Sequence, residues 1–388
     1  MVTLTTAENA LKTLYLGVVT EQLNTAVNPL LTKFEQTTSD VWGKEIRKLA
    51  AYGVNGGVGA GSEDGNLPTP GQNNYAQFVL ELKNLYGTIE ISDKAIRASQ
   101  NSSGAFVNLL NAEMEGLIKA SKFNFGRMLY GDGSGKLCRV ETKTGLNTVI
   151  VDSVKNLMEG MIVDLYNSSD EIDASGIRIN GVLHSTRNII IDRTTEGLPF
   201  TDSNGYFVMQ GSYQKELTGL GALFGNTETL YGLEKSKNPW LTPYKKTSAE
   251  LTDVVIQRAI DHLDETAGSM ADFIVCSSGV KRAYQNYLIT NRTNIDIMDL
   301  KGGYKAMSYN GIPLISDRFV PSGTMYILNT KDFHLHQLCD WRWLEGDDGR
   351  VIKQVAGRPV YTATLVKYAD LICDRPVGQA MISGITEQ

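Results

Sequence analysis

The sequence has no surplus of basic residues, few cysteines and histidines, and no long hydrophobic run. Its 388 residues include 37 basic and 43 acidic side chains, a formal net charge of −6. A dedicated polyanion-binding protein usually carries a basic surplus, so this balance argues against that class. The four cysteines lie far apart without a CxxC pair, which predicts reduced thiols rather than disulfides or a zinc finger.

Membrane and export signals are also missing. No stretch approaches 18 uncharged apolar residues, and residues 1–8 lack the basic start and apolar core of a signal peptide. We therefore expect a protein that is made and used in a soluble compartment, without a membrane partner. Hydrophobic residues make up 42% of the chain, which is enough to build a sizeable core.

Glycine, in contrast, is abundant and unevenly spread. Of 38 glycines, seven lie within nineteen residues: Gly53, Gly56, Gly57, Gly59, Gly61, Gly65 and Gly71. The spacing does not fit a GxGxxG nucleotide loop, because Ser62 and Asp64 stand where the last glycine is required. No hydrophobic period crosses this stretch, which also contains Pro68 and Pro70, so it predicts a flexible segment.

Two extended segments follow the glycine cluster, over residues 75–83 and 85–91. Their apolar alternation predicts a long two-stranded hairpin with the glycine-rich segment at its tip. Because an isolated hairpin is barely stable in water, we expect the surface that supports it to belong to another molecule.

The strongest helical pattern runs from Ser103 to Tyr130 and keeps an apolar stripe over its whole length. The helix would be about 40 Å long, and the sequence from Gly131 to Gly135 ends it. Gly131 to Lys136 fails as a phosphate loop, since the helix precedes the glycines and the spacing is one residue short.

Residues 137–217 predict a small β-barrel or sandwich inserted into the chain. Turn signals at Asn180-Gly181 and Asn204-Gly205 separate or flank the strands. Five short strands are expected, at residues 149–151, 161–165, 177–179, 188–191 and 206–209.

Elsewhere the chain predicts mixed α/β structure with long strands near its end. Apolar residues at helical spacing suggest short helices around residues 11–19 and 30–34, and Thr247 with Glu250 predicts a capping box. The remaining elements are a strand at 273–276, a helix at 280–289, a turn at Asn310-Gly311 and strands at 333–343 and 360–373.

Catalytic and metal-binding patterns are weak. The sequence has no GxSxG motif, and no spacing singles out a pair of carboxylates. His334, His336 and Cys339 come nearest to a metal site, because the two histidines share one face of a strand. The apolar neighbours of these residues favour an ordinary half-buried strand, so we predict no metal, no cofactor and no enzyme. Trp341 and Trp343 fit the same strand without a stacking role.

The order of these elements resembles that of tailed-phage major capsid proteins, whose fold is also found in encapsulin shells. Three stretches carry the resemblance besides the order: residues 304–315, with the sequence YKAMSYNGIPLI; residues 323–329, GTMYILN; and residues 157–164, LMEGMIVD, in the β insertion. It implies an α+β phage major-capsid fold with an N-terminal arm, an extended β-hairpin loop, a long spine helix, peripheral and axial domains, and an inserted small β-barrel.

The resemblance also implies a division of the chain. The expected parts are an N-terminal arm (1–49), the extended loop (50–100), the spine helix of the peripheral domain (101–136), the barrel (137–217), most of the axial domain (218–330), the return strands of the peripheral domain (331–374) and a C-terminal segment of the axial domain (375–388). Subunit contacts are expected at Gly53, Gly57, Gly61, Gly65, Pro68, Pro70, Tyr75, Phe78 and Lys83.

The function implied is an icosahedral shell of pentamers and hexamers around double-stranded phage DNA, assembled in the host cytoplasm and retained in the virion. Further partners would be a scaffolding protein, unless a scaffolding segment has already been removed, a portal, a decoration protein, and DNA held by weak non-specific contact. Two alternatives stay open at this point: an encapsulin-like nanocompartment and a ligand-binding enzyme built on the β insertion.

Overall fold

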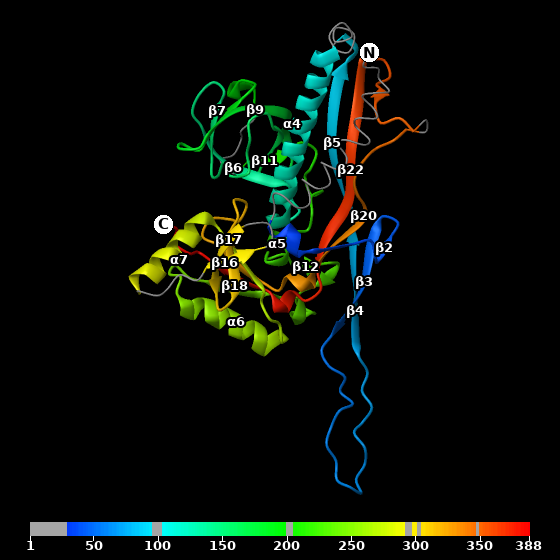
Figure 1. The fold of residues 1–388 in the computed structure, drawn as a ribbon, viewed down its shortest axis with the longest axis vertical. Helices are drawn as coiled ribbons and strands as arrows, with labels where there is room; N and C mark the ends of the chain where they lie inside the picture. Colours follow the sequence, from blue (N-terminus) through cyan, green and yellow to red (C-terminus); the bar gives the residue numbers. More distant parts are fainter. Residues whose placement is uncertain (1–28, 95–102, 199–204, 292–296, 301–303, 347–348) are drawn as a thin grey trace.

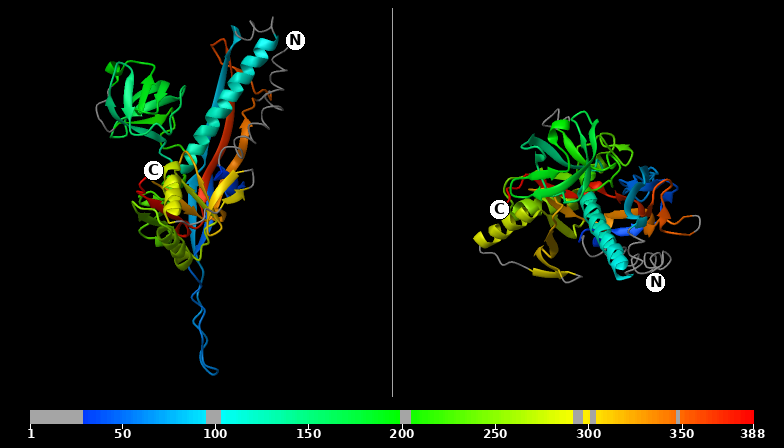
Figure 2. Two further views of the ribbon diagram at one scale, coloured as in Figure 1. Left: turned by 60° about the vertical axis from the view of Figure 1, so that its left-hand side comes forward. Right: turned by 90° about the horizontal axis from the view of Figure 1, so that it is seen from above.

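The computed structural model describes residues 29–94, 103–198, 205–291, 297–300, 304–346 and 349–388. These residues form a body from which a thin hairpin extends at one end, while a separate barrel stands beside the long helix (Figures 1 and 2). None of the helices in these ranges has both the length and the apolar character needed to cross a membrane.

The body is built on a sheet of long strands with one long helix packed against it, running alongside β5 and β22 (Figures 1 and 2). Helix α4 spans Ser103–Tyr130, the range that the apolar stripe predicted. The sheet has the order β1-β20-β22-β21, and β5 also pairs with β22. Its strands are β1 (Glu35–Thr37), β5 (Lys83–Ser92), β20 (Phe333–Trp343), β21 (Lys353–Gln354) and β22 (Val360–Cys373).

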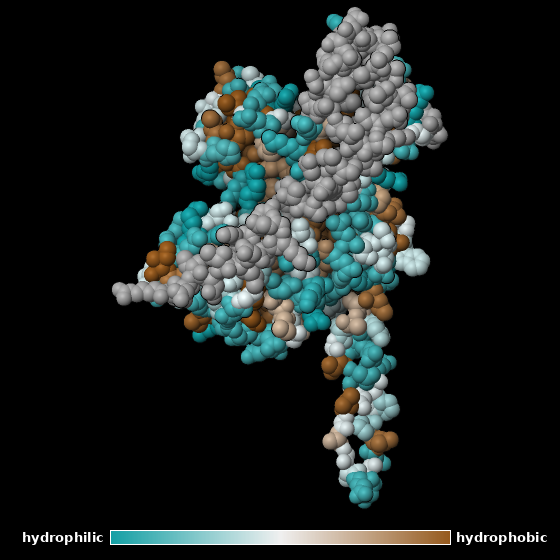
Figure 3. All heavy atoms as spheres, in the orientation of Figure 1, coloured by the Kyte–Doolittle hydropathy of each residue, from teal (hydrophilic) through white to brown (hydrophobic). Residues whose placement is uncertain are grey.

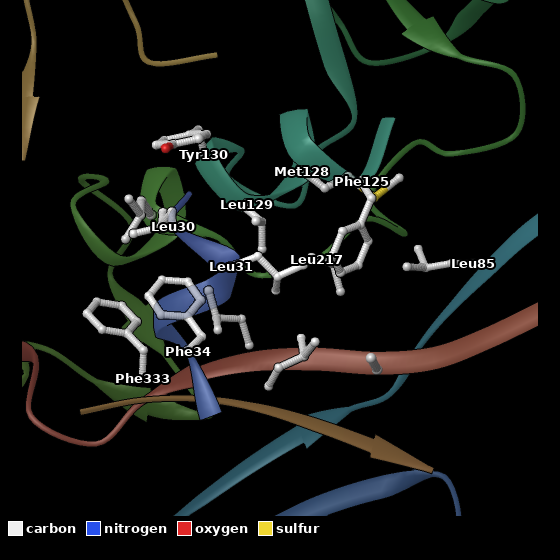
Figure 4. Packing of buried hydrophobic residues seen from close by; sticks show 14 of the residues in the cluster. Leu30, Leu31, Phe34, Leu85, Phe125, Met128, Leu129, Tyr130, Leu217 and Phe333 are labelled. Carbon is white, nitrogen blue, oxygen red and sulfur yellow. The ribbon is translucent and has the colours of Figure 1, made fainter. Parts of the chain in front are cut away.

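The chain between residues 29 and 37 belongs to the core of this body. Figure 4 shows Leu30, Leu31 and Phe34 lying among side chains from the end of α4 and from the sheet. The Phe34 ring stacks on Phe333 with 4.9 Å between ring centroids. The expected helix at 30–34 is a single 3-10 turn, η2 (Leu31–Lys33), and the expected helix at 11–19 lies outside the described residues.

A second sheet of seven strands packs with two helices around a separate core. Its order is β14-β23-β19-β15-β18-β17-β16, and helices α6 and α7 share the core of this sheet. The elements are β14 (Tyr244–Thr247), α6 (Asp253–Ala267), β15 (Phe273–Cys276), α7 (Ser278–Thr290), β16 (Ile297–Leu300), β17 (Tyr304–Tyr309), β18 (Ile312–Ser316), β19 (Met325–Leu328) and β23 (Ala380–Ser383).

The expected capping box at Thr247 and Glu250 is wrong. Thr247 is the last residue of β14, and α6 begins six residues later. The residue that caps α6 is Thr252, whose hydroxyl accepts a hydrogen bond from the Val255 amide. A threonine hydroxyl can cap a helix at either position, and only the packed helix shows that Thr252 is the one used.

Six strands between Lys136 and Met209 form a closed barrel in the order β10-β7-β6-β11-β8-β9. Aliphatic side chains and Phe207 fill its interior, so the enclosed space is a packed core. The strands are β6 (Lys136–Lys143), β7 (Thr148–Val151), β8 (Ile162–Tyr166), β9 (Ile172–Leu183), β10 (Asn188–Ile191) and β11 (Tyr206–Met209).

Two details of the barrel differ from the expectation. Strand β6 was not predicted, and Asn180-Gly181 lies inside β9 instead of forming a turn. Gly181 pairs with Ile190 of β10, and the chain reverses a few residues later, where Arg187 has a φ of 56°. An Asn-Gly pair is therefore tolerated within a strand when a neighbouring strand supplies the pairing.

The hairpin is the element that departs most from the prediction. Its strands are β3 (Glu45–Tyr52) and β4 (Asn74–Glu81), with the short β2 (Val41–Trp42) alongside β3. The predicted partner of β4, the segment at 85–91, is β5, which instead pairs over ten residues with β22. The glycine-rich segment does join two strands, but the first of them begins within the predicted N-terminal arm (1–49).

Short elements complete the described chain: η3 (Thr195–Gly197), α5 (Leu220–Leu223), β12 (Thr229–Leu230), β13 (Leu233–Glu234), η4 (Pro239–Leu241), η5 (Thr330–Asp332) and η6 (Pro376–Gly378). All four cysteines are free thiols, as predicted. Trp341 and Trp343 are buried in the core of the body, where Trp341 meets Phe125 of α4 edge to face.

Candidate assembly interface

The root of the hairpin is held by a cluster of aromatic rings. Phe78 of β4 is 0% exposed and lies 5.1 Å from the Tyr231 ring and 5.8 Å from the Trp240 ring, measured between centroids. The ring of Tyr52 in β3 stacks on the Trp240 ring, with 4.9 Å between the ring centroids. Both strands of the hairpin are therefore anchored in the body at the same place.

Strand β4 is also joined to the body through its backbone. The Val79 amide donates to the Tyr231 carbonyl at 3.1 Å, next to Gly232 in the turn between β12 and β13. Tyr231 and Gly232 both have positive φ, 52° and 80°, and a side chain on Gly232 would come within 3.3 Å of the Val79 carbonyl. Glycine at this position thus permits the close approach of β4.

Beyond Tyr52 and Asn74 the hairpin continues as a tip, residues 53–73, that has no strand pairing. Gly57 and Gly71 cross so closely that a Cβ on Gly57 would be 2.8 Å from the Gly71 nitrogen. The nearest neighbours of an ideal Cβ on each tip glycine, where it has any within 4 Å, belong to residues 55–74. The tip extends away from the body in Figure 1 and in the left-hand view of Figure 2.

Large apolar side chains are exposed along the hairpin, as the brown spheres of Figure 3 show. In the tip, Val54, Val58 and Leu67 are 84%, 88% and 90% exposed. Leu49 lies on the outward face of the hairpin's strands, and the cross-strand register places Val79 and Tyr75 on the same face. Monomeric proteins seldom expose such a series of apolar residues, so this surface fits a protein partner.

The charge of the tip is one-sided. Residues 53–73 include Glu63 and Asp64 and no lysine or arginine. The turn that carries them is closed by a hydrogen bond from the Gly65 amide to the Ser62 carbonyl at 3.1 Å. A partner surface with basic side chains near this turn would complement it.

Seven of the nine expected contact residues lie in or beside the tip: Gly53, Gly57, Gly61, Gly65, Pro68, Pro70 and Tyr75. The other two do not. Phe78 is buried in the core of its own chain, and Lys83 begins β5 in the body. Alternation along 75–83 marked Phe78 as one face of a strand, but it did not show that this face is covered by Tyr231 and Trp240.

Sequence reasoning missed Leu49 and Val79 of the outward face, together with the exposed Trp42 of β2. The inward-facing residues of β3 are Ile46, Lys48 and Ala50. The apolar alternation of this strand is weak, because a lysine and an alanine occupy two of these three positions. The long stem of a lysine can cover apolar surface, so such a pattern is compatible with a strand.

The candidate metal ligands are engaged by other groups. The Nε2 atom of His334 lies 3.1 Å from a carboxylate oxygen of Asp374, and Nδ1 of His336 lies 3.0 Å from the Ser39 carbonyl. The two imidazole rings are tilted, with 6.2 Å between centroids. Within the described residues, no three His, Cys, Asp or Glu side chains are grouped so as to hold a metal ion.

Comparison with known proteins gives matches among solved structures. The capsid asymmetric unit of cyanophage A-1(L) matches with a TM-score of 0.55 at 15% identity, covering 97% of this chain and 94% of that chain. The holo-SrpI encapsulin complex from Synechococcus elongatus PCC 7942 matches with a TM-score of 0.47 at 10% identity, covering 95% of each chain. The capsid of Myoviridae phage XM1 gives 0.46 at 9% identity and 92% of each chain. No family model and no curated protein matches the chain.

The likeness to the cyanophage structure extends over nearly the whole of both chains, and it places this chain in the class of viral capsid folds. Within that class, the fold is that of the tailed-phage major capsid proteins, as the resemblance in the sequence implied.

Proposed function

We propose that this chain is a major capsid protein that assembles as pentamers and hexamers into an icosahedral shell around double-stranded DNA. One observation carries the proposal. A hairpin with three strongly exposed apolar residues at its tip, Val54, Val58 and Leu67, extends away from the described body. An unsupported two-stranded hairpin is marginally stable, so a neighbouring molecule has to cover it.

The energy available from that contact is large enough to support assembly. Complete burial of one Val or Leu side chain contributes roughly 1.5–3 kcal/mol. Burying the three tip residues against a neighbour would therefore contribute about 5–9 kcal/mol per subunit, before the entropy of association is subtracted. The contact would be repeated by every subunit, so modest interfaces would add up over a closed shell.

The neighbour is a second copy of the chain. A tip that contacts a different surface on the next subunit makes a head-to-tail interface, and such interfaces close into rings when the rotation is suitable. Rings of five and six are the units from which an icosahedral shell is built. Scaffolding, portal and decoration proteins are further expected partners in the virion.

The charge of the chain fits a container better than a DNA reader. With a net charge of −6, the wall would gain little from releasing counterions from DNA. We expect weak, non-specific contact with the contents and no enzymatic role.

The proposal is tested by expressing the chain together with its flanking genes and imaging the product by electron microscopy. Uniform closed shells are expected for the wild type. The double variant Val58→Asp/Leu67→Asp should keep the circular dichroism and melting temperature of the isolated subunit, since both side chains are exposed, but it should not form shells.

Leu146→Asp is the matched control, because Leu146 is also an exposed apolar residue but belongs to the barrel. This variant should assemble. Assembly of the tip variant at wild-type efficiency, or a wild-type product that stays monomeric or dimeric with scaffold present, would contradict the proposal. Shells that contain a co-purified enzyme and no portal would identify an encapsulin-like compartment.

A further inference from the structure

A cluster of ionisable side chains lies where the hairpin meets the body. It joins Glu35 of β1, Lys48 of β3, His334 and His336 of β20, and Asp374, which directly follows β22. Two segments from residues 35–48 and two from residues 334–374 therefore meet at the root of the hairpin. Lys48 points inward on the same strand face as the fully buried Ile46, so the cluster holds the hairpin to the body.

His336 is the most enclosed member, with 1% of its surface exposed. Its Nδ1 atom lies 3.0 Å from the Ser39 carbonyl, and because a carbonyl only accepts, Nδ1 carries the proton and donates it. This leaves Nε2 as the deprotonated nitrogen. Nε2 is buried and has no hydrogen-bond partner among the described residues.

Asp374 is bound on one side only. Its Oδ2 atom accepts from Lys48 Nζ at 2.8 Å and from His334 Nε2 at 3.1 Å, while its buried Oδ1 has no hydrogen-bond partner among the described residues. Glu35 completes the surroundings, with a carboxylate oxygen 3.5 Å from the other nitrogen of His334. Asp332 and Arg375 lie close enough to influence the same charges.

The surroundings of His336 disfavour a second proton. Burial lowers the pKa of His336, and the positive charges of Lys48 and His334 lower it further, against the opposing effects of the Ser39 carbonyl and Asp374. Burial alone would raise the pKa of Asp374, but hydrogen bonds from His334 and Lys48 outweigh burial and lower it. Asp374 therefore stays ionised over the pH range in which His336 would gain a proton.

We propose that this cluster is a proton-operated joint that locks the hairpin to the body when His336 is neutral and releases it when Nε2 of His336 gains a proton. A proton on Nε2 would place a charged donor in a dry site beside Lys48 and His334. The nearest relief is to open the root, which admits water and breaks the Ser39 contact. Only the biological use of the joint rests on the proposed function: it would let the hairpin change its angle during assembly.

The direction of the effect follows from linkage. His336 has a lower pKa in the closed root than in an open one, so the closed form is fully favoured above the ordinary histidine pKa and loses this advantage as the pH falls. Suppose that the closed form bound no proton at all and that His336 had an ordinary pKa of about 6.5 in the open form. The equilibrium constant for opening would then be at most about tenfold larger at pH 5.5 than at pH 7.5.

The test uses the unassembled full chain, so its outcome does not depend on whether shells form. Hydrogen exchange, corrected for the intrinsic pH dependence, reports the opening of the root through the Arg47 amide, which donates to the Asp40 carbonyl at 2.9 Å. Protection in the wild type should fall by up to about tenfold between pH 7.5 and 5.5. His336→Asn, which keeps a donor near the Nδ1 position but cannot titrate, should show constant protection, whereas His334→Asn should still respond.

A second measurement needs no variant in the joint. The chain has four histidines, so selective labelling of the imidazole carbons gives four resonances, and His336 should titrate below the ordinary range. The proposal is overturned if His336 titrates at or above about 6.5. It is also overturned if wild type and His336→Asn respond to pH in parallel, or if only the His334 variant loses the response.

Discussion

Replacing Phe78 with alanine should destabilise the isolated subunit, even though the residue lies in the hairpin strand that continues into the proposed interface. The side chain is completely buried and has aromatic neighbours at 5.1 Å and 5.8 Å, in Tyr231 and Trp240. Removing a buried phenylalanine costs about 3–5 kcal/mol, because the transfer energy is lost and a cavity remains. The root of the hairpin should open first, since Tyr52 depends on the same Trp240 ring.

Denaturant unfolding of the unassembled chain measures this loss, with hydrogen exchange locating it. Tyr75→Ala is the matched control, because Tyr75 is three residues away on the exposed face of the same strand. This control should change the free energy of unfolding by less than about 0.5 kcal/mol and should affect assembly only. A loss below about 1 kcal/mol for Phe78→Ala would refute the assignment of Phe78 to the core of its own chain.

Three further predictions concern the body. Gly87→Ala should lower the free energy of unfolding by about 1–3 kcal/mol, since the new Cβ would lie 2.9 Å from the Leu117 Cδ1 atom. Leu117→Ala in the same chain should recover part of this loss, and strictly additive losses would argue against the contact. Glu216→Gln leaves the buried Arg127 without its ion-pair partner and should cost about 3–5 kcal/mol in unfolding experiments, whereas a change under about 1 kcal/mol would contradict a dry pair. Burial raises the pKa of Asp370 to about 6, so the stability that this protonated carboxyl supplies at pH 4 should decline by about 2 kcal/mol as the pH rises to 6. Asp370→Asn should remove this decline, and a variant with an unchanged pH profile would exclude Asp370 as its source.

Local elements were predictable from the sequence wherever a single period persisted. Helix α4 and the strands β15, β20 and β22 have the bounds that the apolar patterns predicted. The Asn310-Gly311 turn also forms, with both residues at positive φ between β17 and β18. In each of these cases neighbouring residues in the chain are enough to define the element, because the period or the turn chemistry is local.

The site was only partly predictable. Seven glycines in a short segment indicated a flexible tip, and the nearest neighbours of the tip glycines belong to the hairpin itself and not to the body. The strand that leads into the tip was missed, because Lys48 and Ala50 weaken the apolar alternation of β3. Phe78 was assigned to the wrong surface for a related reason, since alternation separates two faces without showing what covers either one.

Residue patterns were therefore enough to predict a set of elements, their order and a flexible segment rich in glycine. Which strands lie side by side became clear only from the folded chain: β5 pairs with β22 and β4 with β3, whereas consecutive alternating segments had suggested β4 with β5. Folding also brought Lys48, His336 and Asp374 together at the root of the hairpin. The physical reason is that a strand's side-chain pattern specifies a buried face, whereas its backbone can pair with any edge that the packing of the whole core brings beside it.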